Sequence, residues 1–140
     1  MNGPLEGLRI LDLTSNFMGP YASLLLADMG ADVCKIEPPE GDTTRNVGPC
    51  RHKGMGAVFL HLNRNKRSIV LDLKHPDGLA ALRRMLPRAD VLLFSLRPQA
   101  MARLGLSYEA VREINPRIVY CGAFGFGQNG PYADRPAYDN

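Results

Sequence analysis

The chain of 140 residues contains no tryptophan, and only 7% of its residues are aromatic. Proteins that hold single-stranded nucleic acid stack bases on aromatic side chains, so this sequence offers little for such binding. Its three cysteines, Cys34, Cys50 and Cys121, are odd in number and lack the Cys-x-x-Cys spacing of metal and redox motifs. Neither a disulfide framework nor a metal site is therefore predicted.

Long hydrophobic runs are also missing. The longest ones, such as residues 22–27 and 91–94, are far shorter than the roughly 20 apolar residues that a membrane-spanning helix requires. The amino terminus lacks the basic region and apolar core of a secretory signal. We therefore expect a soluble, cytoplasmic protein that neither spans nor binds a membrane.

Positive charge is concentrated in the middle of the chain, although the net charge is only +3. Residues 1–50 carry three basic and seven acidic side chains, residues 51–104 carry eleven and three, and residues 105–140 carry three and four. A local patch suits a compact polyanion, whereas nucleic-acid binders are more basic overall. We expect small anionic molecules as partners, and no nucleic acid.

Short aliphatic segments alternate with segments whose apolar residues recur at helical spacing. The predicted strands are residues 9–14, 32–37, 68–73, 91–94 and 117–122. The predicted helices are residues 20–29, 76–86, 99–104 and 108–114. Such alternation favours parallel strands joined by right-handed crossovers, hence a doubly wound, mainly parallel α/β sheet in which ligands bind beyond the carboxyl ends of the strands.

The basic turn before the third predicted strand contains Arg64, Lys66 and Arg67. These side chains suit charge-assisted hydrogen bonds to phosphate, but a solvated turn is an equally good interpretation of the residues alone. The glycine-rich segment 122–132 either brings backbone close to a ligand or forms a flexible connection. The P-loop pattern G-x-x-x-x-G-K-[ST] is absent, and we predict neither a dinucleotide nor a nucleoside triphosphate as ligand.

Asp12 lies inside the first predicted strand, where a carboxylate is costly unless it is hydrogen bonded. We predict a structural role for Asp12 beside the following loop. Cys121 closes the last predicted strand, but no neighbouring base or helix terminus argues for an activated thiol. The three histidines share no spacing typical of metal ligands or of a catalytic triad.

Taken in order, nine short segments resemble the amino-terminal region of the class III (CaiB/BaiF-type) coenzyme A transferases, a family that includes the α-methylacyl-CoA racemases. The segments are Gly19-Pro20, Leu26-Ala27-Asp28-Met29-Gly30-Ala31-Asp32-Val33, Lys35-Ile36-Glu37-Pro38, Asn65-Lys66-Arg67-Ser68, Ala89-Asp90-Val91, Arg97-Pro98, Leu104-Gly105, Asn115-Pro116-Arg117 and Gly125-Phe126-Gly127-Gln128.

The resemblance implies a Rossmann-like CoA-binding large domain, of which residues 1–140 are the amino-terminal part. The rest of that domain and a small domain are expected outside this chain, in a protein whose two subunits interlock like links of a chain. The transferases of the family move CoA from an acyl-CoA thioester to a free carboxylic acid through an aspartyl anhydride. CoA is then a substrate carrier, and no permanently bound cofactor is implied.

The resemblance also implies roles for individual residues. The nucleophilic aspartate is expected after Asn140, so this chain is expected to be an inactive fragment with no catalytic residue, and Asp139 is not the nucleophile. Phe17, Met18 and Tyr138 are expected to line the active site. The expected CoA contacts are Asn16, Leu71, Asp72, Leu73, Ser95, Leu96, Arg103 and Leu104, with Arg103 the strongest single candidate.

The chain departs from some relatives at Phe17, Pro38 and Ser95-Leu96, where those relatives carry polar, basic or Asn-Phe residues. The racemases carry a His-Asp pair where this chain has Tyr138-Asp139. Because tyrosines ionise near pH 10, a tyrosine is a poor substitute for a histidine that exchanges α-protons near neutral pH. A transferase is therefore favoured, with a racemase or a non-catalytic CoA-binding module as alternatives. The donor and acceptor acids are not predicted.

Overall fold

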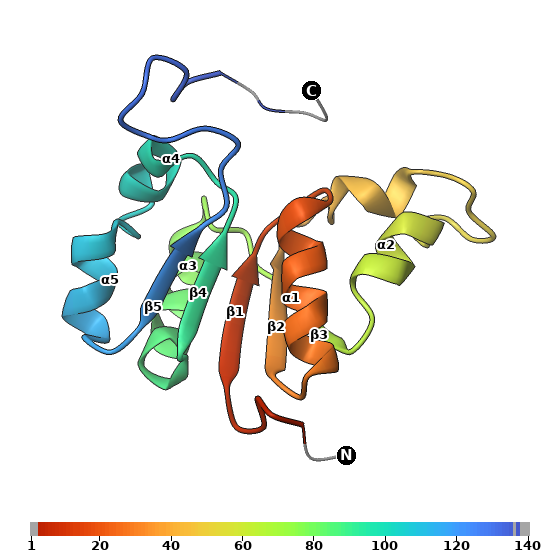
Figure 1. Cartoon of the computed structure of the whole chain (residues 1–140), viewed down its shortest axis with the longest axis horizontal. Helices are drawn as coiled ribbons and strands as arrows, with labels where there is room; N and C mark the ends of the chain where they lie inside the picture. The colour runs from red at the N-terminus through yellow and green to blue at the C-terminus, as the bar shows by residue number, and fades with distance from the viewer. Residues whose placement is uncertain (1–2, 136, 138–140) are drawn as a thin grey trace.

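The computed structural model describes residues 3–135 and 137 (Figure 1). Within them, five parallel strands form one sheet in the order β3-β2-β1-β4-β5. The strands are β1 (Arg9–Leu13), β2 (Asp32–Glu37), β3 (Lys66–Val70), β4 (Val91–Phe94) and β5 (Val119–Gly122). The central strand β1 pairs with both β2 and β4, so the strand order reverses there. This is the predicted doubly wound α/β fold.

The helices lie on both faces of the sheet, with α1 in front and α3 behind in the view of Figure 1. They are α1 (Met18–Asp28), α2 (Ala57–Leu62), α3 (Pro76–Met85), α4 (Pro98–Arg103) and α5 (Tyr108–Ile114), with 3₁₀ turns η1 (Thr43–Asn46) and η2 (Leu86–Arg88). Gly30 follows α1 with φ of 102°, a conformation that favours glycine. Helix α3 starts with Pro76 in its first turn, as predicted.

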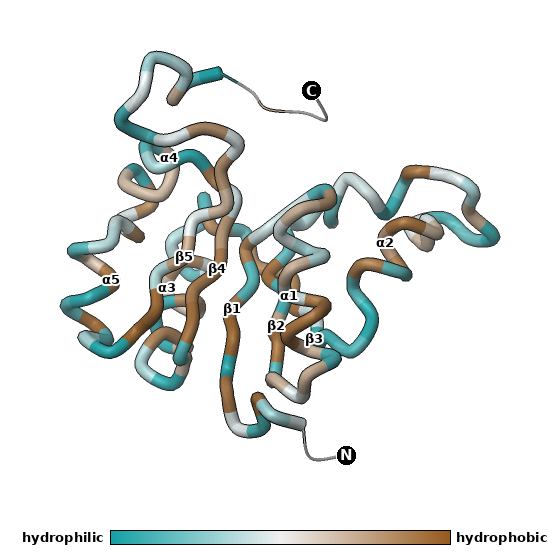
Figure 2. Tube along the Cα trace, viewed as in Figure 1, coloured by the Kyte–Doolittle hydropathy of each residue, from teal (hydrophilic) through white to brown (hydrophobic). Residues whose placement is uncertain are grey.

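Successive strand residues alternate between two hydrophobic cores, one on each face of the sheet. The core against α3, α4 and α5 includes Leu11, Leu13, Leu82, Leu92, Phe94, Met101 and Val111. The core beneath α1 includes Ile10, Ala27, Ala31, Val33 and Leu93. Figure 2 shows the same pattern as hydrophobic colour along β1 and β4. The strands β1, β2 and β4 are largely buried, and β1 and β4 are mostly apolar, whereas β3 at one side of the sheet is mostly exposed.

The structure shifts several predicted boundaries, most of all those of the third and last strands. The third strand covers Lys66–Val70 instead of residues 68–73, because Asp72 begins a turn in which its Oδ1 accepts the N–H of Lys74 at 2.9 Å. The strand predicted for residues 117–122 starts only at Val119. Residues 57–62, where no helix or strand was predicted, form α2.

Asp12 is fully buried and surrounded by donors. Its Oδ1 accepts the N–H of Thr14 at 2.9 Å and the Thr14 hydroxyl, while its Oδ2 accepts the Ser23 hydroxyl and lies 3.3 Å from Lys66 Nζ. The Lys66 ammonium also donates to the carbonyl of Pro20 and to Asn63 Oδ1. Burial lowers the pKa of Lys66 below its ordinary value, and the Asp12 carboxylate offsets only part of this shift. The predicted structural role of Asp12 is confirmed.

Replacing Asp12 tests this buried pair against an exposed one. Asp12→Asn leaves the buried Lys66 ammonium without a carboxylate, so we expect the free energy of unfolding to fall by about 3–5 kcal/mol. Asp32→Asn breaks the exposed Arg67–Asp32 pair and should cost less than about 1 kcal/mol. Urea unfolding followed by circular dichroism measures both. Equal losses in the two variants would contradict the structural role of Asp12.

Candidate functional site

The candidate site is a cavity of about 580 Å³ at the carboxyl edge of the sheet. It is lined by the residues that follow β1, β2, β3 and β4, together with one side of α4. It therefore spans the point where the strand order reverses between β1 and β4, which is where open α/β sheets bind ligands. The lining includes residues 13–15, 35–38, 41–43, 71–74, 95–96, 100 and 103–104.

Hydrogen bonds between neighbouring loops fix the walls of the cavity. The N–H of Ser15, after β1, donates to Ser95 Oγ, after β4, at 3.1 Å. On the other side of β1, Lys35 Nζ donates to the carbonyl of Thr14 at 2.9 Å and pairs with Asp42 Oδ2 at 2.8 Å. The Lys35 and Asp42 side chains are both almost fully buried. Direct hydrogen bonds and an ion pair thus hold the three loops together.

Glu37 organises the loop after β2. Its Oε2 accepts from Arg45 Nε at 2.6 Å and from the N–H of Asp42 at 3.0 Å, and its Oε1 accepts from Arg45 Nη2 at 2.8 Å and from the Ser68 hydroxyl at 2.6 Å. The Arg45 guanidinium also lies 3.7 Å above the centre of the Phe59 ring. Burial raises the pKa of Glu37, but the hydrogen bonds from Arg45 and Ser68 outweigh it and lower the pKa to about 2.

Asp42 is charged for a similar reason. Burial raises its pKa, but the hydrogen bonds from Lys35 and Thr44 bring it below its usual range. Its Oδ1 accepts both the N–H and the hydroxyl of Thr44, at 2.9 and 2.6 Å, which caps η1. Asp42 and Glu37 are therefore anions whose charge is balanced inside the protein, and neither is available to act as a proton donor at neutral pH.

Arg103 and Lys74 are the cations of the cavity that have no such partner. Both line it, and neither side chain forms an ion pair or hydrogen bond with another described residue. Arg103 projects from the end of α4, and Lys74 follows β3 in the turn made by Asp72. Leu71, Leu73 and Leu104 contribute apolar surface beside them. The cavity thus combines two free cations with an aliphatic wall.

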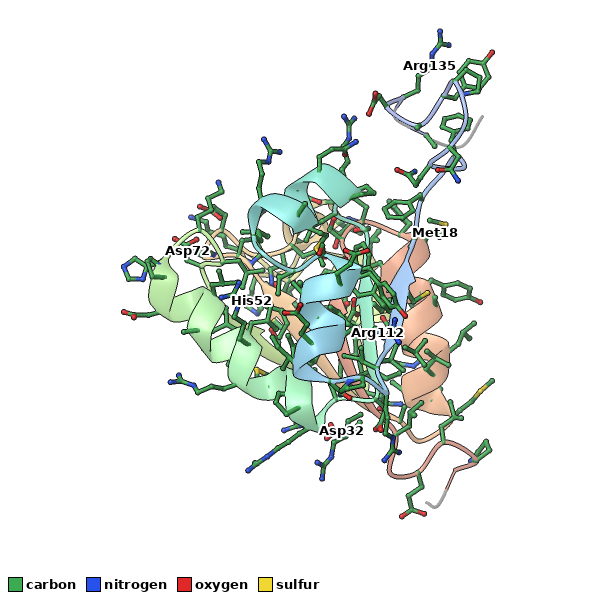
Figure 3. All side chains as sticks on the ribbon, turned by 90° about the vertical axis from the view of Figure 1, so that its left-hand side faces the viewer. Met18, Asp32, His52, Asp72, Arg112 and Arg135 are labelled. Atoms are coloured by element: carbon green, nitrogen blue, oxygen red, sulfur yellow. The ribbon has the colours of Figure 1, made fainter. Side chains whose placement is uncertain are left out.

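Seven of the eight expected CoA contacts line this one cavity: Leu71, Asp72, Leu73, Ser95, Leu96, Arg103 and Leu104. Asn16 does not line it, but its Oδ1 accepts from the hydroxyl of Thr43, which does. Phe17 and Met18, expected in the active site, lie outside the lining at the start of α1, and each is 58% exposed. Figure 3 shows Met18 and Asp72 on different sides of the molecule. Tyr138 lies outside the described residues.

The basic turn lies at the opposite edge of the sheet from the cavity. Arg64, Lys66 and Arg67 lie at the amino-terminal end of β3, opposite the cavity, and each is paired with a carboxylate: Asp28, Asp12 and Asp32 respectively. Of the two interpretations that the residues left open, phosphate binding in this cavity is therefore wrong for these three cations. Residues that precede or begin a parallel strand lie at the amino-terminal edge of the sheet, whereas the cavity lies at the carboxyl edge.

Sequence reasoning missed Lys74, Lys35 and the Asp42 and Glu37 carboxylates. Lys74 had a recognisable signal, since it lies between a predicted strand and the Pro76 that opens a helix, where the carboxyl edge must be. The buried pairs had none, because their partners lie in a loop without periodicity. Residues 125–130 also match the spacing G-x-G-x-x-G, but turns follow them up to residue 135, whereas a dinucleotide fingerprint opens a helix.

Among the described residues, no group of three or more histidine, cysteine, aspartate or glutamate side chains is placed to hold a metal ion. None of the helices in residues 3–135 has the length and apolar character needed to cross a membrane.

The stability contributed by Glu37 should depend on pH. Because its folded pKa of about 2 lies below the ordinary 4.5, this contribution is complete above pH 4.5 and is lost as the pH falls towards 2. Glu37→Gln should lower the free energy of unfolding by about 2–3 kcal/mol at pH 7 and much less at pH 3. The exposed Glu40 of the same loop provides a matched control, Glu40→Gln. Urea unfolding at several pH values measures both, and a pH-independent loss would contradict this assignment.

The profile of CoA-transferase family III matches residues 5–140. The chain is 47% identical to the succinate–glutarate CoA-transferase of Agrobacterium fabrum, over 97% of this chain and 36% of that protein. It is 47% identical to the acetyl-CoA:oxalate CoA-transferase of Acetobacter aceti, over 98% of this chain and 35% of that protein. It is 42% identical to the human succinyl-CoA:glutarate CoA-transferase, over 97% of this chain and 31% of that protein. The chain thus spans about a third of the length of these curated relatives.

Solved structures give the same assignment. A CaiB/BaiF family protein from Brucella suis superposes with a TM-score of 0.94 at 41% identity, over 99% of this chain and 38% of that one. A hypothetical protein from Mycobacterium tuberculosis superposes with a TM-score of 0.89 at 37% identity, over 98% and 38%. With the family profile matching nearly all of its length, the chain belongs to CoA-transferase family III.

Proposed function

We propose that this chain provides the CoA-binding part of an enzyme that transfers CoA from an acyl-CoA thioester to a free carboxylic acid. The cavity at the carboxyl edge is the observation that carries the proposal. Seven of the residues expected to contact CoA line it together, and two of its three cations, Arg103 and Lys74, have no partner among the described residues. The curated relatives named above are CoA-transferases, which supports this reaction over racemisation.

CoA and the cavity match in chemical character. The phosphates of CoA need cations that are not already neutralised, and Arg103 offers a planar fork for two oxygens while Lys74 offers a mobile point charge. The adenine ring and the pantetheine arm need apolar walls, which the leucines of residues 71–73 and 104 supply. We assign Asn16, Phe17 and Met18, at the start of α1, to the thioester end of the ligand, together with Tyr138.

In the proposed reaction, an aspartate beyond Asn140 attacks the thioester carbonyl and expels the CoA thiolate, which leaves an aspartyl anhydride. The acceptor carboxylate then attacks the anhydride, releases the donor acid and forms a new anhydride, from which the retained thiolate takes the acyl group. In this scheme Arg103 and Lys74 hold CoA in place between the two steps.

The same proposal includes the rest of the large domain, a small domain, the interlocked homodimer and a cytoplasmic location. Because the relatives are named for succinate, glutarate and oxalate, we propose short dicarboxylic acids as substrates.

The role of Arg103 can be tested by comparison with Arg64. Arg103→Ala removes an unpaired cation from the cavity, so we expect CoA to bind at least about tenfold more weakly, as for a lost charge-assisted hydrogen bond. Arg64→Ala removes a cation of the basic turn that is already paired with Asp28, and its affinity for CoA should be nearly unchanged. Isothermal titration calorimetry with free CoA measures both. A larger loss of CoA affinity in Arg64→Ala than in Arg103→Ala would instead place the phosphate site at the basic turn.

The reaction itself separates the transferase from the racemase. The complete protein that contains this chain, given succinyl-CoA and isotopically labelled glutarate, should form labelled glutaryl-CoA and release succinate. A racemase would instead incorporate deuterium from solvent at the α-carbon of a branched acyl-CoA without forming a new thioester. Deuterium uptake without transfer would therefore replace our proposal, and CoA binding with neither reaction would leave a binding module.

A further inference from the structure

A second cavity, of about 340 Å³, opens at the amino-terminal edge of the sheet. Four arginines line it and come from four different elements: Arg9 from β1, Arg67 from β3, Arg84 from α3 and Arg88 from η2. It shares no lining residue with the cavity at the carboxyl edge. Figure 3 shows Asp32, at this edge, well below Asp72, at the other.

The charge of this second cavity is not balanced. Its one lining carboxylate, Asp32, is held by Arg67 through three N–H···O contacts of 2.6–3.0 Å. The nearby Asp90 accepts the backbone N–H of Arg9 at 2.8 Å. The side chains of Arg9, Arg84 and Arg88 form no ion pair with any described residue. Three arginines that form no ion pair with a described residue therefore line one concavity.

A solvated surface alone does not explain why these arginines are grouped around one cavity. Arg84 lies in the last turn of α3, where the helix dipole favours a cation, but that explains one arginine and not its grouping with the other two. Like charges brought together around a concave surface repel one another and raise the local positive potential. An anion bound among them would remove that cost.

We propose that this cavity is a second binding site, for a compact small molecule with at least two phosphate or carboxylate groups. Guanidinium forks bind both groups in a bidentate manner. The volume lies at the small end of the range of roughly 300–1,000 Å³ for ligand pockets, which suits a small polyanion better than a whole CoA molecule. None of the lining residues is aromatic, so nothing there would stack nucleic-acid bases. This site is independent of the proposed transferase activity.

Calorimetry with pyrophosphate and with citrate, at constant ionic strength, tests the site directly. We expect saturable binding of at least one probe in the unmodified protein, weakened at least about tenfold by the double variant Arg84→Met, Arg88→Met, which keeps the apolar stems. The control is Arg112→Met, an exposed arginine on α5, which should bind the probe as before. Preference for pyrophosphate would assign phosphate groups to the ligand, and preference for citrate would assign carboxylates.

Cys34 provides a local reporter, because it is half-buried in the lining of the same cavity. With Cys50→Ser and Cys121→Ser, it is the remaining thiol of the chain. Bound probe should slow its alkylation by neutral N-ethylmaleimide several-fold, and should have no such effect in the Arg84→Met, Arg88→Met background. Three results would overturn the proposal: no saturable binding, equal affinity in the double variant, or loss of probe binding when CoA is saturating, which would place the anion in the first cavity.

Discussion

Two buried ion pairs that link β1, β2, β3 and the loop after β2 are the constraint on which the rest of this structure depends. Lys66 pairs with Asp12, and Lys35 pairs with Asp42, with all four side chains almost completely removed from solvent. Removing charges from water costs several kcal/mol per ion, so each pair is tolerated only because further hydrogen bonds complete it. That requirement ties the loop after β1, the loop after β2 and the start of β3 to one another, and so determines the position of the cavity wall.

The pairing also decides which cations remain available to a ligand. A lysine or arginine that neutralises a buried carboxylate cannot also bind a phosphate without leaving that carboxylate unpaired. The charged residues of the central third therefore separate into structural cations, such as Lys66, and free ones, such as Arg103 and Lys74. Basic residues that look alike in the sequence therefore have different roles, because only some of them lie beside a carboxylate of β1 or β2.

The sequence was sufficient for the fold and for most of the cavity, but not for its electrostatics. Strands β2 and β4 and helix α5 have the predicted bounds, because continuous apolar runs and helical periodicity are local signals. The family resemblance brought together residues that follow β3 and β4, which no periodicity could do. The sequence did not show that the cations of the basic turn are already neutralised, because their partners Asp28, Asp12 and Asp32 lie far away in the sequence and become neighbours only in the folded sheet.

The two edges of the sheet differ in how their positive charge arises. At the carboxyl edge, the parallel strands end in loops whose carboxylates, Glu37 and Asp42, are buried and paired with cations. The remaining positive charge there therefore comes from the unpaired cations. At the amino-terminal edge, Arg9 begins β1, Arg67 is the second residue of β3 and the last turn of α3 adds Arg84, with a single lining carboxylate to offset them. The two cavities lie at opposite ends of the parallel strands and share no lining residue. Occupation of one edge should therefore not compete sterically with occupation of the other, and any coupling between them would have to pass through β1 and β2, the strands that contribute residues to both cavities.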